Sequence, residues 1–195
     1  MAGNFVEGSK AQVRKVLEGR RRALTVEEVK AKGGEAQRCL AALSSFQSAQ
    51  TVALYASESF EVPTALLWAG HQVCLPRVNP GSRVLSFHRM GSPTELVPAG
   101  KLKLLEPPGD APRVELTEID FWVIPGTGFT PKGDRLGRGA GYYDSTLVFA
   151  RKDALKVGLT FECCLVDLLP TEPHDIRMDQ VVTELGQRRS ANTHE

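Results

Sequence analysis

Residues 125–144 read PGTGFTPKGDRLGRGAGYYD, and this stretch follows the short apolar run FWVI at residues 121–124. Six glycines fall between residues 126 and 141, and Arg135 and Arg138 stand among them. Glycines let a backbone approach an anion closely, and successive N–H groups of such a loop form an anion-binding concavity. A strand, a glycine-rich basic loop and a helix beginning near Gly141 therefore predict a phosphate site, in which both arginines hold phosphate oxygens.

The stretch matches neither of the common nucleotide motifs. It lacks the Gly-Lys-Ser/Thr end of a P-loop, and Gly137-Arg138-Gly139-Ala140-Gly141 does not have the spacing of a dinucleotide-binding loop. A glycine-rich surface turn with solvated arginines is the alternative interpretation. Loops of this length in compact domains are usually functional or disordered, which favours a functional role.

The stretch resembles the signature of the 5-formyltetrahydrofolate cyclo-ligases, also called 5,10-methenyltetrahydrofolate synthetases. That signature reads Pro-Gly-x-x-Phe-Asp-x-x-Gly-x-Arg-Leu-Gly-x-Gly-x-Gly-Tyr-Tyr-Asp. The matching residues are Pro125, Gly126, Phe129, Gly133, Arg135, Leu136, Gly137, Gly139, Gly141, Tyr142, Tyr143 and Asp144. Thr130 departs from the signature, where the family usually has Asp. Further on, Leu169, Pro170, Glu172, His174 and Asp175 match a second family motif, so the resemblance spans Lys10 to Glu184.

Length and composition are those of one globular domain. The chain has 195 residues, of which 42% are hydrophobic, and its net charge is only +1. This balance gives no sign of a nucleic-acid or membrane partner, and the sequence has no apolar run long enough to span a bilayer. The N-terminus has no apolar signal core, and the four cysteines form no Cys-x-x-Cys pair. We expect reduced thiols in a cytoplasmic protein; a zinc site or a nucleophilic cysteine is the sharper alternative.

Hydrophobic periodicity predicts alternating helices and strands. Expected helices cover residues 8–24, 25–46, 61–70 and 141–149, and expected strands cover 51–55, 71–78, 85–88, 121–124, 156–161 and 181–183. Ser9 and Thr25 are expected N-caps, the second in a capping box with Glu28, and Gly33-Gly34 is expected to break the second helix. Segment 91–118 is expected to be a long surface connection.

This pattern predicts an α/β fold with a mostly parallel central sheet. The resemblance implies the three-layer architecture shared with ribose-5-phosphate isomerase and CoA-transferase-like proteins. We expect a single cyclo-ligase domain over residues 1–195, with N-terminal helices at 8–46, an α/β core at 51–184 and a disordered tail at 185–195. Ligands of such sheets bind at the carboxyl ends of the strands, where the glycine-rich loop leaves.

The resemblance also implies two binding regions. It places Lys10 and Arg14 on the phosphates of ATP, because the family opens with a helix that carries a Lys and an Arg at this spacing. ATP contacts would further come from Arg135, Leu136, Gly137, Arg138, Gly139, Ala140, Gly141, Tyr142 and Tyr143. Folate would be bound by Ala56, Glu61 and residues 138–142, with Glu61 reading the pterin ring. One of the two tyrosines is expected to stack on a ligand, the other to lie in the core.

Mg²⁺ is the expected cofactor. By the resemblance, Asp144 and Asp175 are its two carboxylate ligands, which agrees with the usual preference of Mg²⁺ for one or two carboxylates, waters and substrate phosphates. From the sequence alone, Asp144 could equally be an acid at a helix start, Asp175 a turn residue and Glu61 a first-turn charge of a helix. The Glu106-Pro107 pair matches a family loop that we expect to rim the active site.

The implied reaction converts ATP and 5-formyltetrahydrofolate, with or without a polyglutamate tail, into 5,10-methenyltetrahydrofolate, ADP and phosphate. It would pass through a phosphorylated formyl group, an iminium phosphate, and needs no protein nucleophile. Two alternatives stay open: a sugar-phosphate or CoA-handling enzyme, and a catalytically weak folate-binding protein. The second is suggested by Thr130, Phe161 and Cys164, which replace usual family residues. A monomer is expected rather than an oligomer.

Overall fold

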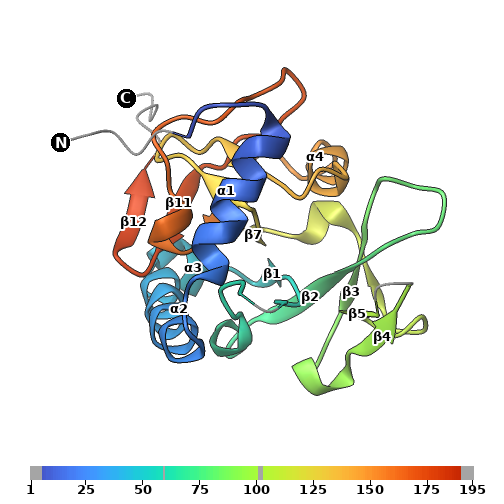
Figure 1. Ribbon diagram of the computed structural model, residues 1–195. Helices are drawn as coiled ribbons and strands as arrows, with labels where there is room; N and C mark the ends of the chain where they lie inside the picture. Colours follow the sequence, from blue (N-terminus) through green and yellow to red (C-terminus); the bar gives the residue numbers. More distant parts are fainter. Residues whose placement is uncertain (1–5, 59, 101–102, 190–195) are drawn as a thin grey trace.

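The computed structural model describes residues 6–58, 60–100 and 103–189, and its centre is an eight-stranded sheet (Figure 1). The strands lie in the order β12-β11-β10-β7-β1-β2-β3-β6. Their bounds are β1 (Thr51–Ala53), β2 (Gln72–Arg77), β3 (Ser86–Arg89), β6 (Arg113–Val114), β7 (Phe121–Ile124), β10 (Leu155–Leu159), β11 (Gln180–Thr183) and β12 (Gly186–Arg189). Strands β11, β10, β7, β1 and β2 pair in parallel, whereas β12, β3 and β6 add antiparallel edges. The prediction of a mostly parallel sheet is confirmed.

Helices and short turns connect these strands. The α-helices are α1 (Lys10–Arg22), α2 (Val26–Ala41), α3 (Ser44–Gln47) and α4 (Tyr142–Leu147). Single 3-10 turns are η1 (Ala65–Leu67), η2 (Pro93–Glu95), η3 (Leu116–Glu118) and η4 (Glu162–Cys164). Ser9 and Thr25 cap α1 and α2 as predicted, and each takes part in a capping box. None of the helices in the described part of the chain is both long and apolar enough to cross a bilayer.

Strand β7 is covered on both faces. Its Phe121 and Val123 belong to one hydrophobic cluster, and Trp122 and Ile124 belong to another. Side chains alternate between the faces of a strand, so β7 is buried on both sides, as expected for the middle of a parallel sheet. The first cluster includes residues of α2 and α3, and the second includes Leu147 of α4. The sheet is therefore the middle layer of the predicted α/β architecture.

Two predictions about the middle of the chain were wrong. Segment 91–118 is not a plain connection: it forms the hairpin of β4 (Val97–Ala99) and β5 (Leu104–Glu106), and β6 pairs with β3. Its prolines and glycines limit these strands to two or three residues, which hides them from a periodicity search. The helix expected over 61–70 is only the turn η1, so Glu61 lies in a loop before it rather than in a helical first turn.

Two predictions about helix and chain ends were also wrong. The helix expected over 141–149 ends at Leu147. The tail expected to be disordered from residue 185 forms β12 up to Arg189, antiparallel to β11; residues 190–195 lie outside the described residues. Polar side chains are compatible with an edge strand because one side of such a strand faces water. Arg188 also pairs with Glu162, at 3.2 Å.

The second predicted helix differs from expectation at Gly33-Gly34. Helix α2 runs through both glycines without a break and ends at Ala41, and α3 is a separate turn after it. A Cβ atom on Gly33 would lie 2.6 Å from Cδ of Pro63, whereas one on Gly34 would meet only the Arg38 guanidinium, at 3.6 Å. Gly33 is therefore required by the close packing of α2 against the loop that follows β1, and Gly34 is not.

We expect the two alanine substitutions to change the free energy of unfolding in opposite directions. Gly34→Ala should stabilise the protein by about 0.5–1 kcal/mol, because alanine is the better helix former. Gly33→Ala should destabilise it by about 1–3 kcal/mol, because the new methyl group overlaps the Pro63 ring. Urea unfolding of both variants and the parent, followed by circular dichroism, measures the difference. Equal shifts of the unfolding midpoint would contradict the packing seen here.

Candidate active site

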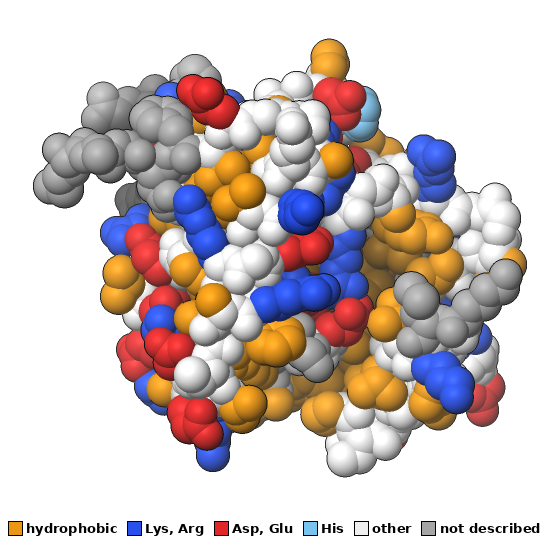
Figure 2. All heavy atoms as spheres, viewed as in Figure 1, with side chains coloured by type: hydrophobic (Ala, Val, Ile, Leu, Met, Phe, Trp, Pro, Cys, Tyr) orange, Lys and Arg blue, Asp and Glu red, His pale blue; other side chains and the backbone are white. Residues whose placement is uncertain are grey.

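A cavity of about 400 Å³ opens at the carboxyl ends of the parallel strands. One wall is the glycine-rich loop between β7 and α4, and the opposite wall is the loop after β1 together with β5. The N-terminal turns of α1 and the segment 172–175 close one end. Figure 2 shows the hollow on this face, with charged side chains beside apolar ones. This position matches the general rule for ligand sites in open α/β sheets.

Every residue that the sequence analysis assigned to the site lines this cavity, and the structure brings them together from four parts of the chain. They are Lys10, Arg14, Ala56, Glu61, Arg135, Leu136, Gly137, Arg138, Gly139, Ala140, Gly141, Tyr142, Tyr143, Asp144 and Asp175. Glu106 also lines it, as expected of a rim residue. Sequence reasoning missed Tyr55, Glu58, Val78 and Leu85, which also line it. The ligand that each residue binds stays a prediction.

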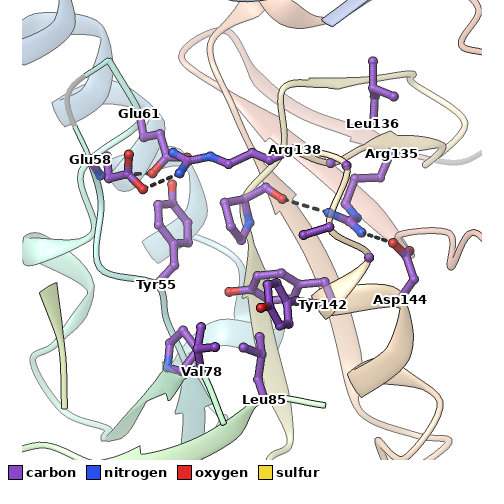
Figure 3. A pocket seen from close by; sticks show the side chains of 18 of the residues that line it. Tyr55, Glu58, Glu61, Val78, Leu85, Arg135, Leu136, Arg138, Tyr142 and Asp144 are labelled. Carbon is purple, nitrogen blue, oxygen red and sulfur yellow. Dashed lines mark hydrogen bonds and ion pairs between the residues drawn. The ribbon is translucent and has the colours of Figure 1, made fainter. Parts of the chain in front are cut away.

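Arg135 lies in a strand and is buried, which contradicts the alternative interpretation of a surface turn with solvated arginines. It lies in β9 (Arg135–Leu136), which pairs with β8 (Gly128–Phe129), and its side chain is only 4% exposed. Its Nη2 donates to the Asp144 carboxylate at 2.8 Å, and its guanidinium carbon lies 5.6 Å from the centre of the Tyr143 ring. Arg135 therefore holds Asp144 in place, while its Nη1 donates to the Pro125 carbonyl at 3.4 Å (Figure 3).

Close contacts explain the glycines of the loop. A Cβ atom on Gly137 would lie 2.8 Å from Nη1 of Arg135, and Gly139 has a left-handed φ of 101°. Arg14 of α1 donates from Nε to the Gly137 carbonyl at 2.7 Å. Gly141 precedes α4, also with a left-handed φ, of 71°. The loop is thus folded against the Arg135 and Arg14 side chains, with a backbone that only glycine adopts without strain.

Arg138 crosses from the glycine-rich loop to the opposite wall. Its Nη2 donates to Oε1 of Glu61 at 2.8 Å, and its Nη1 donates to Oε1 of Glu58 (Figure 3). Burial opposes the charged form of Arg138, but the hydrogen bond with Glu58 and the attraction of both carboxylates outweigh it, so the pKa of Arg138 is raised. The predicted phosphate residue Arg138 and the predicted pterin residue Glu61 therefore contact each other directly.

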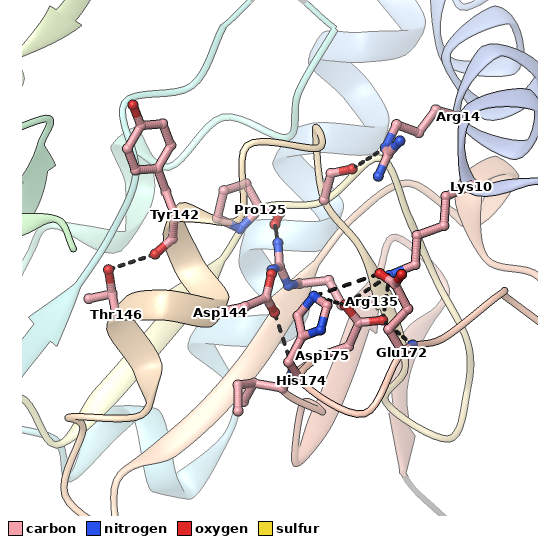
Figure 4. A network of polar contacts seen from close by, with 12 residues as sticks. Lys10, Arg14, Pro125, Arg135, Tyr142, Asp144, Thr146, Glu172, His174 and Asp175 are labelled. Carbon is pink, nitrogen blue, oxygen red and sulfur yellow. Dashed lines mark hydrogen bonds and ion pairs between the residues drawn. The ribbon is translucent and has the colours of Figure 1, made fainter. Parts of the chain in front are cut away.

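A second ionic cluster lies at the α1 end of the cavity (Figure 4). Lys10 Nζ lies 2.6 Å from the Glu172 carboxylate and 2.7 Å from that of Asp175. Burial opposes the charged forms of Lys10 and Asp175, but the hydrogen bond between them favours the charged forms more strongly. The pKa of Lys10 is therefore raised and that of Asp175 is lowered. Asp144 accepts the backbone N–H of Ile176 at 3.2 Å, next to Asp175 in the chain. The two carboxylates predicted for Mg²⁺ thus lie on adjoining segments.

The donor set at this end fits a hard divalent cation. Glu172, His174 and Asp175 each offer one possible ligand atom within 4.8 Å of the others, and Asp144 of α4 contacts the neighbouring Ile176 N–H. Carboxylate oxygens are the protein ligands that Mg²⁺ prefers. In this structure Lys10 and Arg135 neutralise these carboxylates, each through an ion pair. The negative charge of these carboxylates can therefore be balanced by Lys10 and Arg135 or by a bound cation.

The three residues that depart from family usage all lie outside the cavity. Thr130 is fully buried and exchanges hydrogen bonds with Asp134, its Oγ1 donating to the carboxylate at 2.9 Å. Phe161 is buried in the main hydrophobic cluster, and the Cys164 thiol faces the Leu17 carbonyl at 3.6 Å. All four cysteines are free thiols. The departures therefore lie in internal packing, although Phe161 borders a small pocket behind the wall that it shares with Tyr55 and Glu61.

The two tyrosines after Gly141 both line the cavity and both also contact the second hydrophobic cluster, so this placement does not tell which of them faces a ligand. The Tyr143 hydroxyl is buried with no hydrogen-bond partner in the described part of the chain, and burial raises the pKa of Tyr143. The Tyr142 carbonyl accepts the Thr146 hydroxyl at 2.7 Å, which ties the first turn of α4 together. Stacking on a ligand by either ring stays a prediction.

Comparison with known proteins identifies the family. The model of the 5-formyltetrahydrofolate cyclo-ligase family matches residues 6–184 of this chain. The chain belongs to that family. A cyclo-ligase of Escherichia coli is 36% identical over 179 residues, which cover 86% of this chain and 96% of the relative. The cyclo-ligase of Mycolicibacterium smegmatis is 35% identical and covers 90% and 93% of the two chains. The resemblance deduced from the glycine-rich stretch is thereby confirmed.

Solved structures agree with this cyclo-ligase assignment. The NMR structure of an Aquifex aeolicus 5,10-methenyltetrahydrofolate synthetase is 31% identical, has a TM-score of 0.82 and covers 95% of each chain. A Mycoplasma pneumoniae 5,10-methenyltetrahydrofolate synthetase, 23% identical, has a TM-score of 0.74 and covers 91% of this chain and 99% of that one. The second comparison shows the fold alone, and the first supports both fold and family.

Proposed function

We propose that this protein catalyses the ATP-dependent conversion of 5-formyltetrahydrofolate to 5,10-methenyltetrahydrofolate, with release of ADP and phosphate. The observation that carries the proposal is one cavity lined by all residues of the cyclo-ligase motif that were assigned to the site. Glu61 and Glu58 stand on one wall, and Lys10, Arg14, Asp144 and Asp175 stand at the far end. A folate and a nucleotide phosphate can thus approach each other from opposite sides.

The reaction can proceed in two steps without a protein nucleophile. In the first, the formyl oxygen attacks the γ-phosphorus, the bond from phosphorus to the β–γ bridging oxygen breaks, and ADP leaves. In the second, N10 attacks the formyl carbon and loses its proton, and phosphate departs with the former formyl oxygen. The protein must align the formyl oxygen with the γ-phosphate and neutralise the charge that develops. The cations and the loop glycines that line the cavity would serve both tasks.

The phosphate groups of ATP would lie at the glycine-rich loop and the first turns of α1. Arg14 already contacts the Gly137 carbonyl, so its remaining guanidinium donors stand beside the loop that would hold the phosphates. Lys10 would exchange part of its contact with Glu172 and Asp175 for a phosphate oxygen. Arginine suits the first role because its planar fork holds phosphate oxygens in pairs.

Asp144 and Asp175 would hold Mg²⁺, which, when bound, would neutralise phosphate charge during the transfer. Arg135 would keep the Asp144 carboxylate turned toward the cavity, since its Nη2 fixes one carboxylate oxygen. Glu172 is a further candidate ligand, because it shares Lys10 with Asp175. The cytoplasmic location, the monomeric state and binding of polyglutamylated folate stay predictions.

The direct test follows product formation by the purified protein. Methenyltetrahydrofolate is measured by its absorbance and ADP by a coupled assay, with and without 5-formyltetrahydrofolate. We expect one ADP for each methenyl product and no ADP release without the folate. Release of ADP without folate, or with a sugar phosphate or a CoA ester in its place, would favour the other enzyme class. Tight folate binding without turnover would identify a binding protein, an alternative weakened by the position of Thr130, Phe161 and Cys164 outside the cavity.

Glu61→Gln tests the folate end of the cavity. The side chain of Glu61 is 8% exposed, and glutamine keeps its shape while replacing one acceptor oxygen with a donor. Loss of a charge-assisted hydrogen bond to the pterin should cost about 1.5–3 kcal/mol, a roughly 10- to 150-fold rise in the Kd for 5-formyltetrahydrofolate. The Kd for ATP should change little. An unchanged folate Kd with a raised ATP Kd would reverse the assignment of the two ends.

A further inference from the structure

Glu58 lines the cavity wall beside Glu61 and is not one of the predicted ATP, folate or metal ligands. Its side chain accepts a hydrogen bond from Nη1 of Arg138, and its backbone N–H donates to Oε2 of Glu61 at 3.0 Å. The Glu58 carboxylate therefore contacts Arg138 and its backbone N–H contacts Glu61, the two residues that bridge the cavity walls. Glu58 also lies three residues before Glu61, so one loop carries both carboxylates (Figure 3).

Arg138 divides its two terminal nitrogens between Glu58 and Glu61, and this division sets the number of hydrogen bonds that it makes with Glu61. A guanidinium forms its strongest carboxylate pair with two parallel N–H donors from two nitrogens. Here Nη1 is taken by Glu58, so Arg138 contacts Glu61 through Nη2 alone. Among the described residues, the hydrogen bond to Oε2 of Glu61 comes from the Glu58 backbone N–H, which leaves acceptor capacity on both carboxylate oxygens for donors of a ligand.

The backbone of this loop is held in an uncommon conformation. Phe60 has a φ of 66°, in the left-handed region that a bulky residue rarely adopts. The Glu61 N–H donates to the Glu58 carbonyl at 3.0 Å, so the turn is closed by backbone hydrogen bonding in addition to the shared arginine. Strain of this kind persists only where surrounding contacts impose it, and it concentrates at ligand sites.

We propose that Glu58 is a positioning residue for folate: by occupying one nitrogen of Arg138, it prevents a two-bond Arg138–Glu61 pair and keeps Glu61 available to the pterin donors. The inference rests on the proposed function and assigns to its folate end a residue that acts through Arg138. When Glu58 is removed, Arg138 turns both of its terminal nitrogens to Glu61, and the pterin must compete with a stronger internal ion pair.

The test measures binding of 5-formyltetrahydrofolate in the absence of ATP, by titration calorimetry, to the parent, Glu58→Ala, Arg138→Ala and the double variant. Glu58→Ala should raise the folate Kd roughly tenfold, the effect of about one charge-assisted hydrogen bond. The double variant should bind folate as Arg138→Ala does, because Glu58 then has no arginine to occupy. Glu118→Gln, an exposed carboxylate outside the cavity, is the matched control and should bind as the parent does.

Three other results would overturn the role proposed for Glu58, and a fourth would refute the proposed function as well. A folate Kd of Glu58→Ala equal to or below that of the parent would overturn the inference, as would an equal loss from Glu58→Ala in the Arg138→Ala background. If Glu58→Ala does not fold, Glu58→Gln keeps the side-chain size and should show a smaller shift in the same direction, and no shift would again overturn it. A parent that does not bind 5-formyltetrahydrofolate would instead refute the proposed function and the inference with it.

Discussion

Asp144→Asn is expected to lower the free energy of unfolding by about 3–5 kcal/mol, because it leaves the Arg135 guanidinium buried without its carboxylate partner. The Arg135 side chain is 4% exposed and that of Asp144 is 16% exposed, so water compensates little for the lost charge. The same variant should need far more Mg²⁺ for a given rate, since the carboxylate that we propose as a metal ligand is also lost. Urea unfolding and the rate against free Mg²⁺, at saturating ATP and 5-formyltetrahydrofolate, measure the two effects separately.

Asp175→Asn is the matched comparison for Asp144→Asn. Its partner Lys10 keeps a second carboxylate, that of Glu172 at 2.6 Å, so we expect a much smaller loss of stability. The Mg²⁺ requirement should nevertheless rise, to a degree set by whether the contact with the metal is direct or through water. If both variants keep the Mg²⁺ dependence of the parent, the two carboxylates are structural and the metal is held by ATP alone. If Asp144→Asn unfolds at the parent's midpoint, the pair with Arg135 carries little stability.

Arg138→Ala is expected to reduce turnover strongly while the protein stays folded. Its side chain is 45% exposed and belongs to a loop, so little packing is lost. Removal of the proposed charge-assisted contact to phosphate should cost about 1.5–3 kcal/mol, or a roughly 10- to 150-fold loss in kcat/KM for ATP. The structure adds a second effect, because the buried Glu61 carboxylate also loses its cation partner. A change in folate affinity should therefore accompany the loss in ATP turnover.

Arg138→Lys separates charge from geometry in this prediction. Lysine keeps the positive charge near Glu61 but cannot donate two N–H groups in a fixed plane. We expect Arg138→Lys to keep most of the parent's thermal stability and to recover only part of the lost turnover, as measured by steady-state kinetics at varied ATP. Equal ATP affinity and rate in the parent and in Arg138→Ala would show that Arg138 serves only the carboxylates opposite.

The helix caps, the central strand and the family motif could be predicted from the sequence, because each depends on residues that are close together in the chain. A cap such as Thr25 acts within one helical turn, and the run FWVI at 121–124 is apolar throughout, as a strand buried on both faces must be. The glycine-rich motif is likewise one contiguous stretch, so the family could be identified from the sequence of that stretch. These properties depend on neighbours within a few residues, which a single sequence displays directly.

Long-range packing decided what the sequence left open. The sequence shows two adjacent glycines at 33 and 34, but only the approach of Pro63 makes the first necessary and leaves the second replaceable. It shows two loop arginines of the same kind, but the fold buries Arg135 against Asp144 and sends Arg138 across the cavity to Glu58 and Glu61. The partner of a charged side chain is chosen by contacts between segments 80 residues apart in the chain, as Arg138 and Glu58 are, and no local pattern records that choice.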